Sequence, residues 1–427
     1  MTTGKRFLFL QGPHGPFMFR LGRILTRAGA QVWRVGFNAG DRVFWPARKS
    51  YIPFKDRLEN WPDRLDAILQ DKAITDIVLY GDTRPVHREA VKQAKARGLR
   101  LHVLEEGYLR PYWVTYERGG SNGHSPLVDM SIDRMRAILC EKGPQTPFSK
   151  ATHWGDMRQH IFYGAVYHWF VMFANFAYRK VERHRELKVQ HELILYLRRL
   201  FFMPIHALER MIETWRVRQG GFPYHLALLQ LEHDESFRKH SPFATMSEFL
   251  GLIIAGFAKG APEHHRLVIK AHPLETGRIP LRRMIRKLAK HHGIAGRVHY
   301  VRGGKLAPML NETRSAITIN STAGQQVLLR GIPLKTFGRS VYDKPELVSK
   351  QPLEAFFANP QSPDAEAYQL YRRFLLETSQ IPGGYYSTRG RRQLIRQLAD
   401  LILAAETPYE RIANQGNSDV SLLKLVP

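Results

Sequence analysis

The chain of 427 residues contains a single cysteine, Cys140. One thiol cannot form an internal disulfide or complete a zinc site built from several cysteines, so a disulfide framework is excluded and a reducing compartment fits best. The Walker phosphate-binding loop and the GxGxxG fingerprint are missing, as is any HExxH or paired-histidine metal spacing. We therefore expect no metal and no resident cofactor.

A long apolar run is missing at the N-terminus as well. Residues Phe7–Leu10 are consecutively apolar, but Gln11, Gly12 and Pro13 follow at once. This run is too short for the apolar core of a signal peptide, and no small-residue cleavage site comes after it. We expect the protein to stay in the cytoplasm.

Acidic residues are scarce, since 38 Asp and Glu stand against 64 Lys and Arg, which gives a net charge of +26. Such a surplus attracts polyanions, which include nucleic acid, anionic lipid and phosphorylated substrates. The basic residues are spread along the chain without a recognition motif, which disfavours nucleic acid. Hydrophobic residues make up 44% of the chain, enough for sizeable cores, and its length favours two domains.

Short apolar segments alternate with helical patterns in two regions of the chain. The strand patterns are 6–10, 31–35, 75–80 and 100–104 in the first region, and 224–231, 266–270, 298–301, 315–319 and 333–337 in the second. Helical patterns lie at 20–27, 84–97, 246–259, 278–291, 322–329, 365–377 and 391–405. This alternation predicts an α/β fold with two Rossmann-like domains and parallel sheets, which by analogy is the GT-B glycosyltransferase architecture.

We place an N-terminal domain at 1–220, a second domain at 221–345, and helices that return toward the first domain at 346–427. Parallel sheets bind ligands beyond the carboxyl ends of their strands. A site is therefore expected at the loops that begin near Gln11, Gly81 and Glu105.

A helical insertion at about 155–215 interrupts the pattern. Its segment Ile161–Tyr178 contains no Asp, Glu, Lys or Arg, and a strongly charged stretch follows. Three interpretations stay open: a membrane-spanning helix, a buried helical hairpin, or a hairpin whose aromatic face enters the lipid interface while basic residues meet anionic headgroups.

Two adjacent carboxylates, Glu105 and Glu106, stand where a strand pattern meets a Gly turn. Neighbouring residues of a strand point to opposite faces, so we expect at most one of them to face a cleft, as a nucleophile or general base. Arg110 could pair with a substrate carboxylate or phosphate. The plain alternative is an ordinary polar exit from a strand.

Three further polar clusters follow strand patterns. In KAHPLE, Lys270, His272 and Pro273 place an imidazole at a strand end, where it could donate to a phosphate or exchange a proton. In NSTAG, Asn320, Ser321, Thr322, Ala323 and Gly324 open a helix whose free amides could bind an anion, or form a plain N-cap. Between the halves, Gln230 and Asp234 belong to a ligand wall, a hinge or a solvated linker.

Taken in order, these motifs resemble the capsule polysaccharide biosynthesis family. The stretches that carry the resemblance are QGPHGPF, EEGYLRPYWVTYERGGSN, LQLEHDESFRKHSPF, KAHPLE and NSTAGQQVLL, and they extend to about Gly338. More narrowly, they are similar to the family's β-Kdo transferases, which begin the lipid anchor of the capsule in Gram-negative bacteria.

The resemblance implies a GT-B enzyme that transfers the acidic sugar Kdo, with retention, from CMP-Kdo to lysophosphatidylglycerol. Such an enzyme would act as a peripheral protein on the cytoplasmic face of the inner membrane, where other capsule assembly proteins are candidate partners. A non-catalytic glycolipid-binding protein of capsule export or assembly remains an alternative, as does a related transferase with another sugar or acceptor.

By position, Glu106 takes the place of an Asp that is the nucleophile in related modules of the family, and Glu105 stands beside it. The donor would then be held by the polar clusters of the second region, namely Lys270, His272, Pro273, Asn320, Ser321, Thr322, Ala323 and Gly324, with Gln230 and Asp234. The Kdo carboxylate or the acceptor would meet Arg110, Gln11, His14 and Asn122.

Overall fold

The structure is a computed structural model that describes residues 4–140, 155–181, 189–275 and 277–413. The chain divides into two compact units, Met1–Glu186 with Arg372–Pro427 (unit 1) and Leu187–Tyr371 (unit 2). The expected boundaries at 220 and 345 therefore differ from those found. The second unit begins earlier because its first helix packs on its own sheet, and it also retains the segment from 346 to 371.

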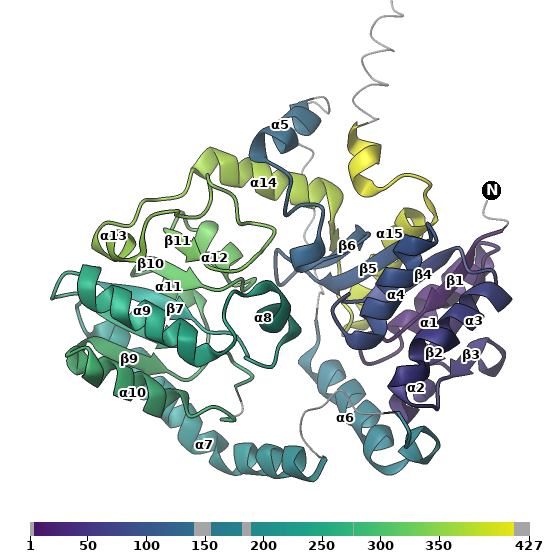
Figure 1. Cartoon of the computed structure of the whole chain (residues 1–427), viewed down its shortest axis with the longest axis horizontal. Coiled ribbons are helices and arrows are strands. Elements are labelled where there is room, and N and C mark those ends of the chain that lie inside the picture. Colours follow the sequence, from purple (N-terminus) through teal and green to yellow (C-terminus); the bar gives the residue numbers. More distant parts are fainter. Residues whose placement is uncertain (1–3, 141–154, 182–188, 276, 414–427) are drawn as a thin grey trace, which may run out of the picture. The chain divides into compact units, whose positions relative to one another are not determined.

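Unit 1 is built on a sheet of strand order β12-β6-β5-β4-β1-β2-β3 (Figure 1). Its strands are β1 (Arg6–Phe9), β2 (Gln31–Gly36), β3 (Tyr51–Pro53), β4 (Asp76–Tyr80), β5 (Arg100–Glu106), β6 (Trp113–Arg118) and β12 (Gln380–Pro382). The first five are parallel, whereas β6 pairs antiparallel with β5 and with β12. The sheet is therefore parallel where the site was expected.

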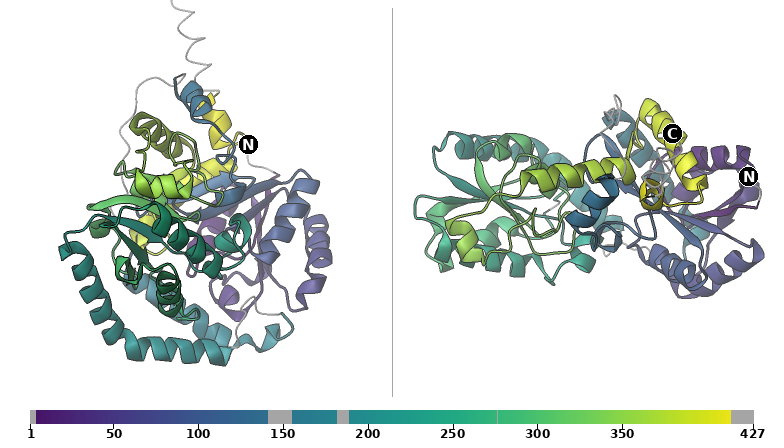
Figure 2. Two further views of the ribbon diagram at one scale, coloured as in Figure 1. Left: turned by 60° about the vertical axis from the view of Figure 1, so that its left-hand side comes forward. Right: turned by 90° about the horizontal axis from the view of Figure 1, so that it is seen from above.

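Helices cover both faces of this sheet and bury a core on each (Figure 2). One core joins the sheet to α1 (Phe17–Arg27) and α15 (Thr388–Leu403), and the other joins it to α3 (Trp61–Asp71) and α4 (Pro85–Ala96). Both α3 and α4 carry Pro in their first turn, where the missing N–H costs no helical hydrogen bond. The shorter or bordering helices are α2 (Ala39–Val43), α5 (Ile132–Cys140) and α14 (Ala365–Thr378).

Unit 2 has an all-parallel sheet of order β11-β10-β7-β8-β9. Its strands are β7 (Tyr224–Leu228), β8 (Arg266–Lys270), β9 (Val298–Val301), β10 (Thr313–Thr318) and β11 (Leu334–Thr336), and its helices include α8 (Glu235–His240), α9 (Met246–Gly260), α10 (Leu281–His291), α11 (Ala307–Leu310), α12 (Gly324–Leu328) and α13 (Leu353–Ala358). The near-continuous apolar runs of β7 and β8 are typical of strands covered on both faces.

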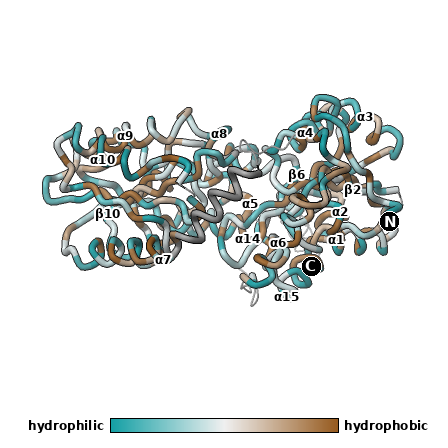
Figure 3. Tube along the Cα trace, turned by 90° about the horizontal axis from the view of Figure 1, so that it is seen from below, coloured by the Kyte–Doolittle hydropathy of each residue, from teal (hydrophilic) through white to brown (hydrophobic). Residues whose placement is uncertain are grey.

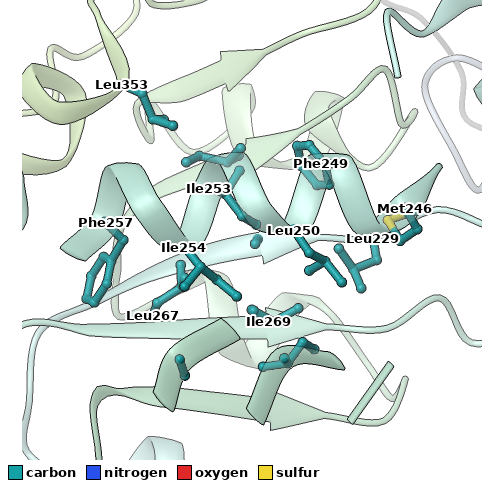
Figure 4. Packing of buried hydrophobic residues seen from close by; sticks show 14 of the residues in the cluster. Leu229, Met246, Phe249, Leu250, Ile253, Ile254, Phe257, Leu267, Ile269 and Leu353 are labelled. Atoms are coloured by element: carbon teal, nitrogen blue, oxygen red, sulfur yellow. The ribbon is translucent and has the colours of Figure 1, made fainter. Parts of the chain in front are cut away.

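Helix α9 supplies the centre of the unit 2 core (Figure 4). Leu250, Ile253, Ile254 and Phe257 recur at helical spacing and are fully buried against the sheet and α13. Thr245 caps the helix by accepting a hydrogen bond from the Glu248 N–H at 3.3 Å. This packing holds the carboxyl ends of β7 and β8 in fixed positions.

The expected strands are present at every position, and the two Rossmann-like units are confirmed. Strands β3, β6 and β12 were not anticipated. Strands β3 and β12 are edge strands with three paired residues each, which leave little periodicity in the sequence, whereas β6 is a six-residue strand inside the sheet. The helix expected at 322–329 is shorter, since only Gly324–Leu328 are helical.

The central insertion contributes one helix to each unit. Helix α6 (Met157–Phe173), followed by a short turn at Asn175–Tyr178, belongs to unit 1 and packs on α2, whereas α7 (Val189–Gln219) belongs to unit 2 and packs on β9. The insertion is therefore divided between the two units. Among the residues that the structure describes, no helix combines the length and apolarity needed to cross a bilayer.

Candidate active site

The two adjacent glutamates lie at the carboxyl end of β5, between β4 and β6. Along β5, Leu101 and Val103 belong to the core beneath α3 and α4, and Leu104 belongs to the core beneath α1 and α15. Because side chains alternate along a strand, Glu105 and Glu106 are directed to opposite faces of the sheet. The two carboxylates therefore have different surroundings, although both stand at the same end of the sheet.

Glu106 is surrounded by tyrosines. The Tyr80 hydroxyl, at the end of β4, donates to Glu106 Oε1 at 3.1 Å, and the Tyr385 ring stands 5.3 Å from the Tyr80 ring. Burial and the charge of Glu106 raise the pKa values of Tyr80, Tyr385 and Tyr386, so all three phenols stay protonated at neutral pH. A carboxylate held by a phenol has a defined orientation, as a nucleophile requires.

Glu105 differs from its neighbour in its electrostatics. Burial raises its pKa to about 7, although the Glu106 N–H, which donates to Glu105 Oε1 at 3.1 Å, and the positive charges of Arg110 and Arg84 act in the opposite direction. The backbone carbonyl of Glu105 accepts a hydrogen bond from the Tyr385 hydroxyl at 3.1 Å. A carboxyl that titrates near neutral pH is suited to proton exchange.

Gly81 makes room for this arrangement. It has a φ of +68° immediately after β4, and a β-carbon there would lie 3.0 Å from Glu105 Oε2. Its backbone N–H donates to the Leu104 carbonyl at 2.9 Å, which keeps the ends of β4 and β5 together. The sequence predicts a site at the loop near Gly81, because parallel sheets bind ligands beyond the carboxyl ends of their strands.

The loop between β5 and β6 carries Arg110, which is exposed and donates through Nε to the Gly107 carbonyl at 3.2 Å. A buried network anchors the loop, because Tyr108 donates through its hydroxyl to Glu117 at 2.6 Å and accepts from the Asn122 N–H at 2.7 Å. Burial raises the pKa of Glu117 to about 7. The Asn122 backbone therefore helps to anchor this loop through Tyr108.

Gln11 and His14 lie in the loop after β1. The Gln11 amide donates to Asp41 Oδ2 at 3.1 Å, and the His14 ring lies 4.4 Å from the ring of Tyr167 on α6. The His14 backbone also hydrogen-bonds the phenol of Tyr386, whose pKa Glu106 raises. Tyr386 thus links His14 to the glutamate site, whereas the Gln11 side chain is bound to Asp41.

In unit 2, Lys270 ends β8 and is buried, and His272 and Pro273 follow in the loop. Burial and the positive charge of Arg210 lower the pKa of Lys270 to about 8. His272 Nδ1 accepts a hydrogen bond from the Leu274 N–H at 3.1 Å. In a neutral imidazole the proton then sits on Nε2, which makes that nitrogen a donor.

His272 and Pro273 open onto a cavity of about 720 Å³. Five arginines line it, whereas Glu275 is the one acidic residue among the lining side chains. The arginines are Arg210 of α7, Arg282, Arg283 and Arg286 of α10, and Arg302 after β9. This excess of positive charge is suited to a ligand with phosphate or carboxylate groups.

Ion pairs and glycines shape the cavity wall. Glu209 of α7 pairs with Arg282 and, at 3.4 Å, with Arg302, which ties the helix to α10 and to the loop after β9. Gly303 and Gly304 have φ values of +65° and +85°, and a β-carbon on Gly304 would lie 2.9 Å from the Arg210 side chain. Glycine is needed there for Arg210 to reach the cavity.

Gln230 and Asn320 form hydrogen bonds with each other near the ends of β7 and β10. Gln230 Nε2 donates to Asn320 Oδ1 at 2.7 Å, and the Asn320 N–H donates to Gln230 Oε1 at 3.1 Å. Asn320 Nδ2 further donates to the His240 carbonyl at 3.2 Å. Both residues therefore position the two strand ends. Asp234 is exposed, and its backbone carbonyl accepts from the Arg238 N–H in the first turn of α8.

The amides of Ala323 and Gly324, which were expected to be free, are bonded within the turn. The Ala323 N–H donates to Ser321 Oγ at 3.2 Å, and the Gly324 N–H donates to the Ser321 carbonyl at 2.9 Å. Thr322 closes the next step of the turn by accepting from the Gln325 N–H at 3.1 Å. The turn satisfies its own amides because α12 has only five residues.

The residues that sequence reasoning missed come from other elements. Tyr80 and Tyr385 surround Glu106, and Arg210, Arg286 and Arg302 line the cavity. Arg302 follows a strand and precedes two glycines, a signal that could have been noticed. Arg210 lies in the middle of a long helix, where nothing in the local sequence distinguishes it from other surface arginines.

Two α/β units, each with polar groups at the carboxyl ends of parallel strands, define a two-domain protein of the doubly wound α/β class. The family model for capsule polysaccharide biosynthesis proteins matches residues 75–386. The chain therefore belongs to the capsule polysaccharide biosynthesis protein family.

The chain is also similar to individual capsule proteins and to a solved structure. It is 29% identical over 387 residues to the capsule polysaccharide export protein KpsS of Escherichia coli, covering 90% of this chain and 98% of that protein. It is 31% identical over 406 residues to the capsule polysaccharide modification protein LipB of Neisseria meningitidis serogroup A, covering 91% and 93%. The β-Kdo 2,7 transferase structure of Thermosulfurimonas dismutans KpsC is similar over 93% of this chain and 99% of that one, with 11% identity and a TM-score of 0.45.

Proposed function

We propose that this protein is a retaining β-Kdo glycosyltransferase that moves Kdo from CMP-Kdo to a lysophosphatidylglycerol acceptor, and so starts the lipid anchor of a capsular polysaccharide. The observation that carries the proposal is the cavity beside His272, whose five arginines suit a donor with both a phosphate and a sugar carboxylate. Family membership and the names of the two relatives, for capsule polysaccharide export and modification, support the pathway.

Glu106 is the proposed nucleophile. Its carboxylate oxygen attacks the anomeric carbon of Kdo, the bond from that carbon to the phosphate oxygen breaks, and CMP leaves with the electron pair. The acceptor hydroxyl then attacks the same carbon, and the glycosyl ester breaks to restore the carboxylate. Two inversions give net retention. The Tyr80 hydroxyl at 3.1 Å keeps the attacking carboxylate in one orientation.

Glu105 is the proposed proton acceptor for the second displacement. The acceptor hydroxyl must lose its proton as it forms the new bond, and a carboxylate whose conjugate acid has a pKa of about 7 can take it. Arg110 would pair with the Kdo carboxylate. His14, which is linked to the site through Tyr386, and Asn122, which helps to anchor the loop through Tyr108, would support the acceptor side.

The donor phosphate is assigned to unit 2. The Nε2–H of His272 and the side chains of Lys270 and Arg210 supply donors that stabilise CMP as it leaves. The hydroxyls of Ser321 and Thr322 would contact the nucleotide, while Gln230 and Asn320 hold the strand ends.

We further propose that transfer needs no metal ion. Among the described residues, no three His, Cys, Asp or Glu side chains gather as a metal-binding group, and the cavity arginines supply positive charge instead. Incubation with EDTA should leave the rate of transfer unchanged, and restoration of a lost rate by Mg²⁺ or Mn²⁺ would contradict this. We propose that the protein acts at the cytoplasmic face of the inner membrane, where the donor and the anionic lipid acceptor meet.

The direct test is an assay of purified protein with CMP-Kdo and a fluorescent lysophosphatidylglycerol, read by mass spectrometry of lipid and intact protein. The proposal expects one Kdo on the lipid with wild type and none with Glu106→Gln. Loss of activity in Glu105→Gln with activity kept in Glu106→Gln would move the nucleophile by one residue. Binding of glycolipid without CMP release would favour the alternative, a non-catalytic protein of capsule export or assembly.

A further inference from the structure

Helix α6 exposes large apolar side chains, whereas its hydrogen-bonding residues Gln159, Tyr163 and Tyr167 are half-buried. The segment Ile161–Tyr178 contains no charged Asp, Glu, Lys or Arg, yet no residue of α6 is fully buried. A helix on the surface of a water-soluble domain normally buries its apolar face and exposes its polar one. The large apolar side chains that α6 exposes depart from this pattern.

Hydrogen bonds hold the inner face of α6 to unit 1. Gln159 Oε1 and the Tyr163 hydroxyl accept from the buried guanidinium of Arg391 at 3.0 and 3.3 Å. The Tyr167 hydroxyl accepts from Asn38 Nδ2 at 2.7 Å. The following turn is held as well, since Asn175 Oδ1 accepts from the Ala39 N–H at 2.9 Å. The helix is thus fixed along its whole length.

Glycines let the inner tyrosines approach the backbone. A β-carbon on Gly15 would lie 3.0 Å from the ring of Tyr163, and one on Gly40 would lie 2.6 Å from the ring of Tyr167. The Tyr178 hydroxyl meets the Tyr51 hydroxyl at 2.9 Å. Such close packing defines the rotation of α6 about its axis, and therefore which residues face outward.

Much of α6 is hydrophobic along its trace (Figure 3), and its exposed large apolar side chains recur at helical spacing. Phe162, Trp169, Phe173 and Phe176 are 61%, 54%, 57% and 66% exposed. Met157, Ile161 and Met172 extend the same stripe. Aromatic side chains on one helix face are typical of helices that lie in the membrane interface. We name the seven residues the α6 stripe.

Positive charge borders the α6 stripe. Arg158 is exposed at one end, and Arg179 and Lys180 are exposed at the other, where the Arg179 guanidinium lies 5.0 Å from the Phe176 ring centre. Helix α15 begins at Thr388, whose hydroxyl donates to Gln159 at 3.3 Å, so its first turns adjoin the start of α6.

Two neighbouring helices add further arginines. Arg389, Arg392 and Arg396 are exposed on α15, and Arg20, Arg23 and Arg27 are exposed on α1, which packs against α15. Helix α1 carries no acidic residue at all. Because like charges repel, a cationic rim of this kind disfavours a second copy of the chain and favours an anionic surface.

We propose that the α6 stripe is an interfacial anchor that inserts into the headgroup region of an anionic bilayer, with the arginines of α1 and α15 on the lipid phosphates. The helix would lie in the plane of the membrane, in agreement with its exposed face and with the absence of a spanning helix among the described residues. This inference deepens the proposed function, since it rests on a lipid acceptor for its purpose.

The test is flotation of the full-length protein with vesicles of phosphatidylethanolamine and phosphatidylglycerol, and with vesicles of phosphatidylcholine alone. Wild type should float with the anionic vesicles. Trp169→Gln/Phe173→Gln should weaken that binding at least about tenfold, since two aromatic side chains leave the interface. The matched control is Leu252→Gln/Leu329→Gln, which removes two exposed apolar side chains of unit 2 and should bind as wild type does.

Three results would overturn the proposal. The first is that wild type does not float with anionic vesicles, and the second is that the α6 variant floats as wild type does. The third is that wild type is a dimer in solution whereas the α6 variant is a monomer. Transfer of Kdo to a short-chain, water-soluble lysophosphatidylglycerol separates this inference from the proposed function. The α6 variant should keep that soluble activity. If wild type lacks it but still floats through the α6 stripe, the anchor stands and the proposed function fails.

Discussion

The Tyr80 hydroxyl and Glu106 Oε1 lie 3.1 Å apart, across the ends of the adjacent strands β4 and β5. The phenol stays protonated because burial and the carboxylate charge raise the pKa of Tyr80 well above its usual value. It therefore donates permanently to Glu106 and leaves the other carboxylate oxygen for chemistry. This contact links the sheet topology to the proposed nucleophile.

Replacement of Tyr80 by Phe tests whether this hydrogen bond positions the nucleophile. A hydrogen bond to a charged group contributes about 1.5–3 kcal/mol, so kcat should fall about tenfold or more while KM for CMP-Kdo changes little. The control is Tyr224→Phe, which removes a buried hydroxyl that donates to the Met309 carbonyl in unit 2. Equal losses in both variants would indicate a general effect on folding.

The raised pKa of Glu105 predicts a pH dependence. A general base must be ionised, so kcat/KM should rise with pH and level off above about 7, the value to which burial raises this pKa. Glu105→Gln should abolish the inflection and lower the rate about 100-fold. An unchanged pH profile in the variant would assign the proton transfer to another group.

The cavity arginines should decide donor affinity. Arg210→Gln and Arg286→Gln each remove a charged donor from the cavity wall and should weaken binding of CMP about tenfold, as measured by calorimetry. Added salt should reduce the difference between wild type and variants. Arg330→Gln is the control, because the guanidinium of this exposed arginine donates to the Gln326 carbonyl of its own turn and does not line the cavity. Full CMP affinity in both cavity variants would place the donor elsewhere.

Unit 2 should lose stability in acid. His225 Nε2 and His265 Nδ1 are 3.0 Å apart, and burial lowers their pKa values to about 3 and about 4. The unfolded chain binds protons near pH 6.5 and the folded one does not, so this contribution is present above that pH and is lost as the pH falls below it. The urea midpoint of wild type should therefore drop between pH 7.5 and pH 5.

The variant His225→Gln isolates this pair. It keeps a polar side chain able to meet Ser315 Oγ, which lies 2.8 Å from His225 Nδ1, but removes one of the two titrating rings. Its urea midpoint should change less between the two pH values than that of wild type. Parallel curves for both proteins would show that other groups govern the acid sensitivity.

Part of the candidate site could be predicted from the sequence, because the ends of short, apolar parallel strands can be located in it. Apolar runs such as 100–104 and 266–270 are short and continuous, and the residues that follow them, Glu105 and His272, necessarily lie at the same edge of their sheets. The alternation of side chains along β5 gave the opposite directions of Glu105 and Glu106 by the same geometry.

The sequence by itself determined the two α/β units, the strand ends that carry polar residues, and the apolar character of 161–178, since all of these depend on periodicity along the chain. The tertiary structure alone decided what surrounds them. Tyr385 reaches Glu105 and Arg210 reaches the cavity from elements distant in sequence. Hydrogen bonds from Asn38 and Arg391 hold Tyr167 and Tyr163 of α6 inward, because buried polar groups must be paired, and the large apolar side chains of the α6 stripe stay exposed.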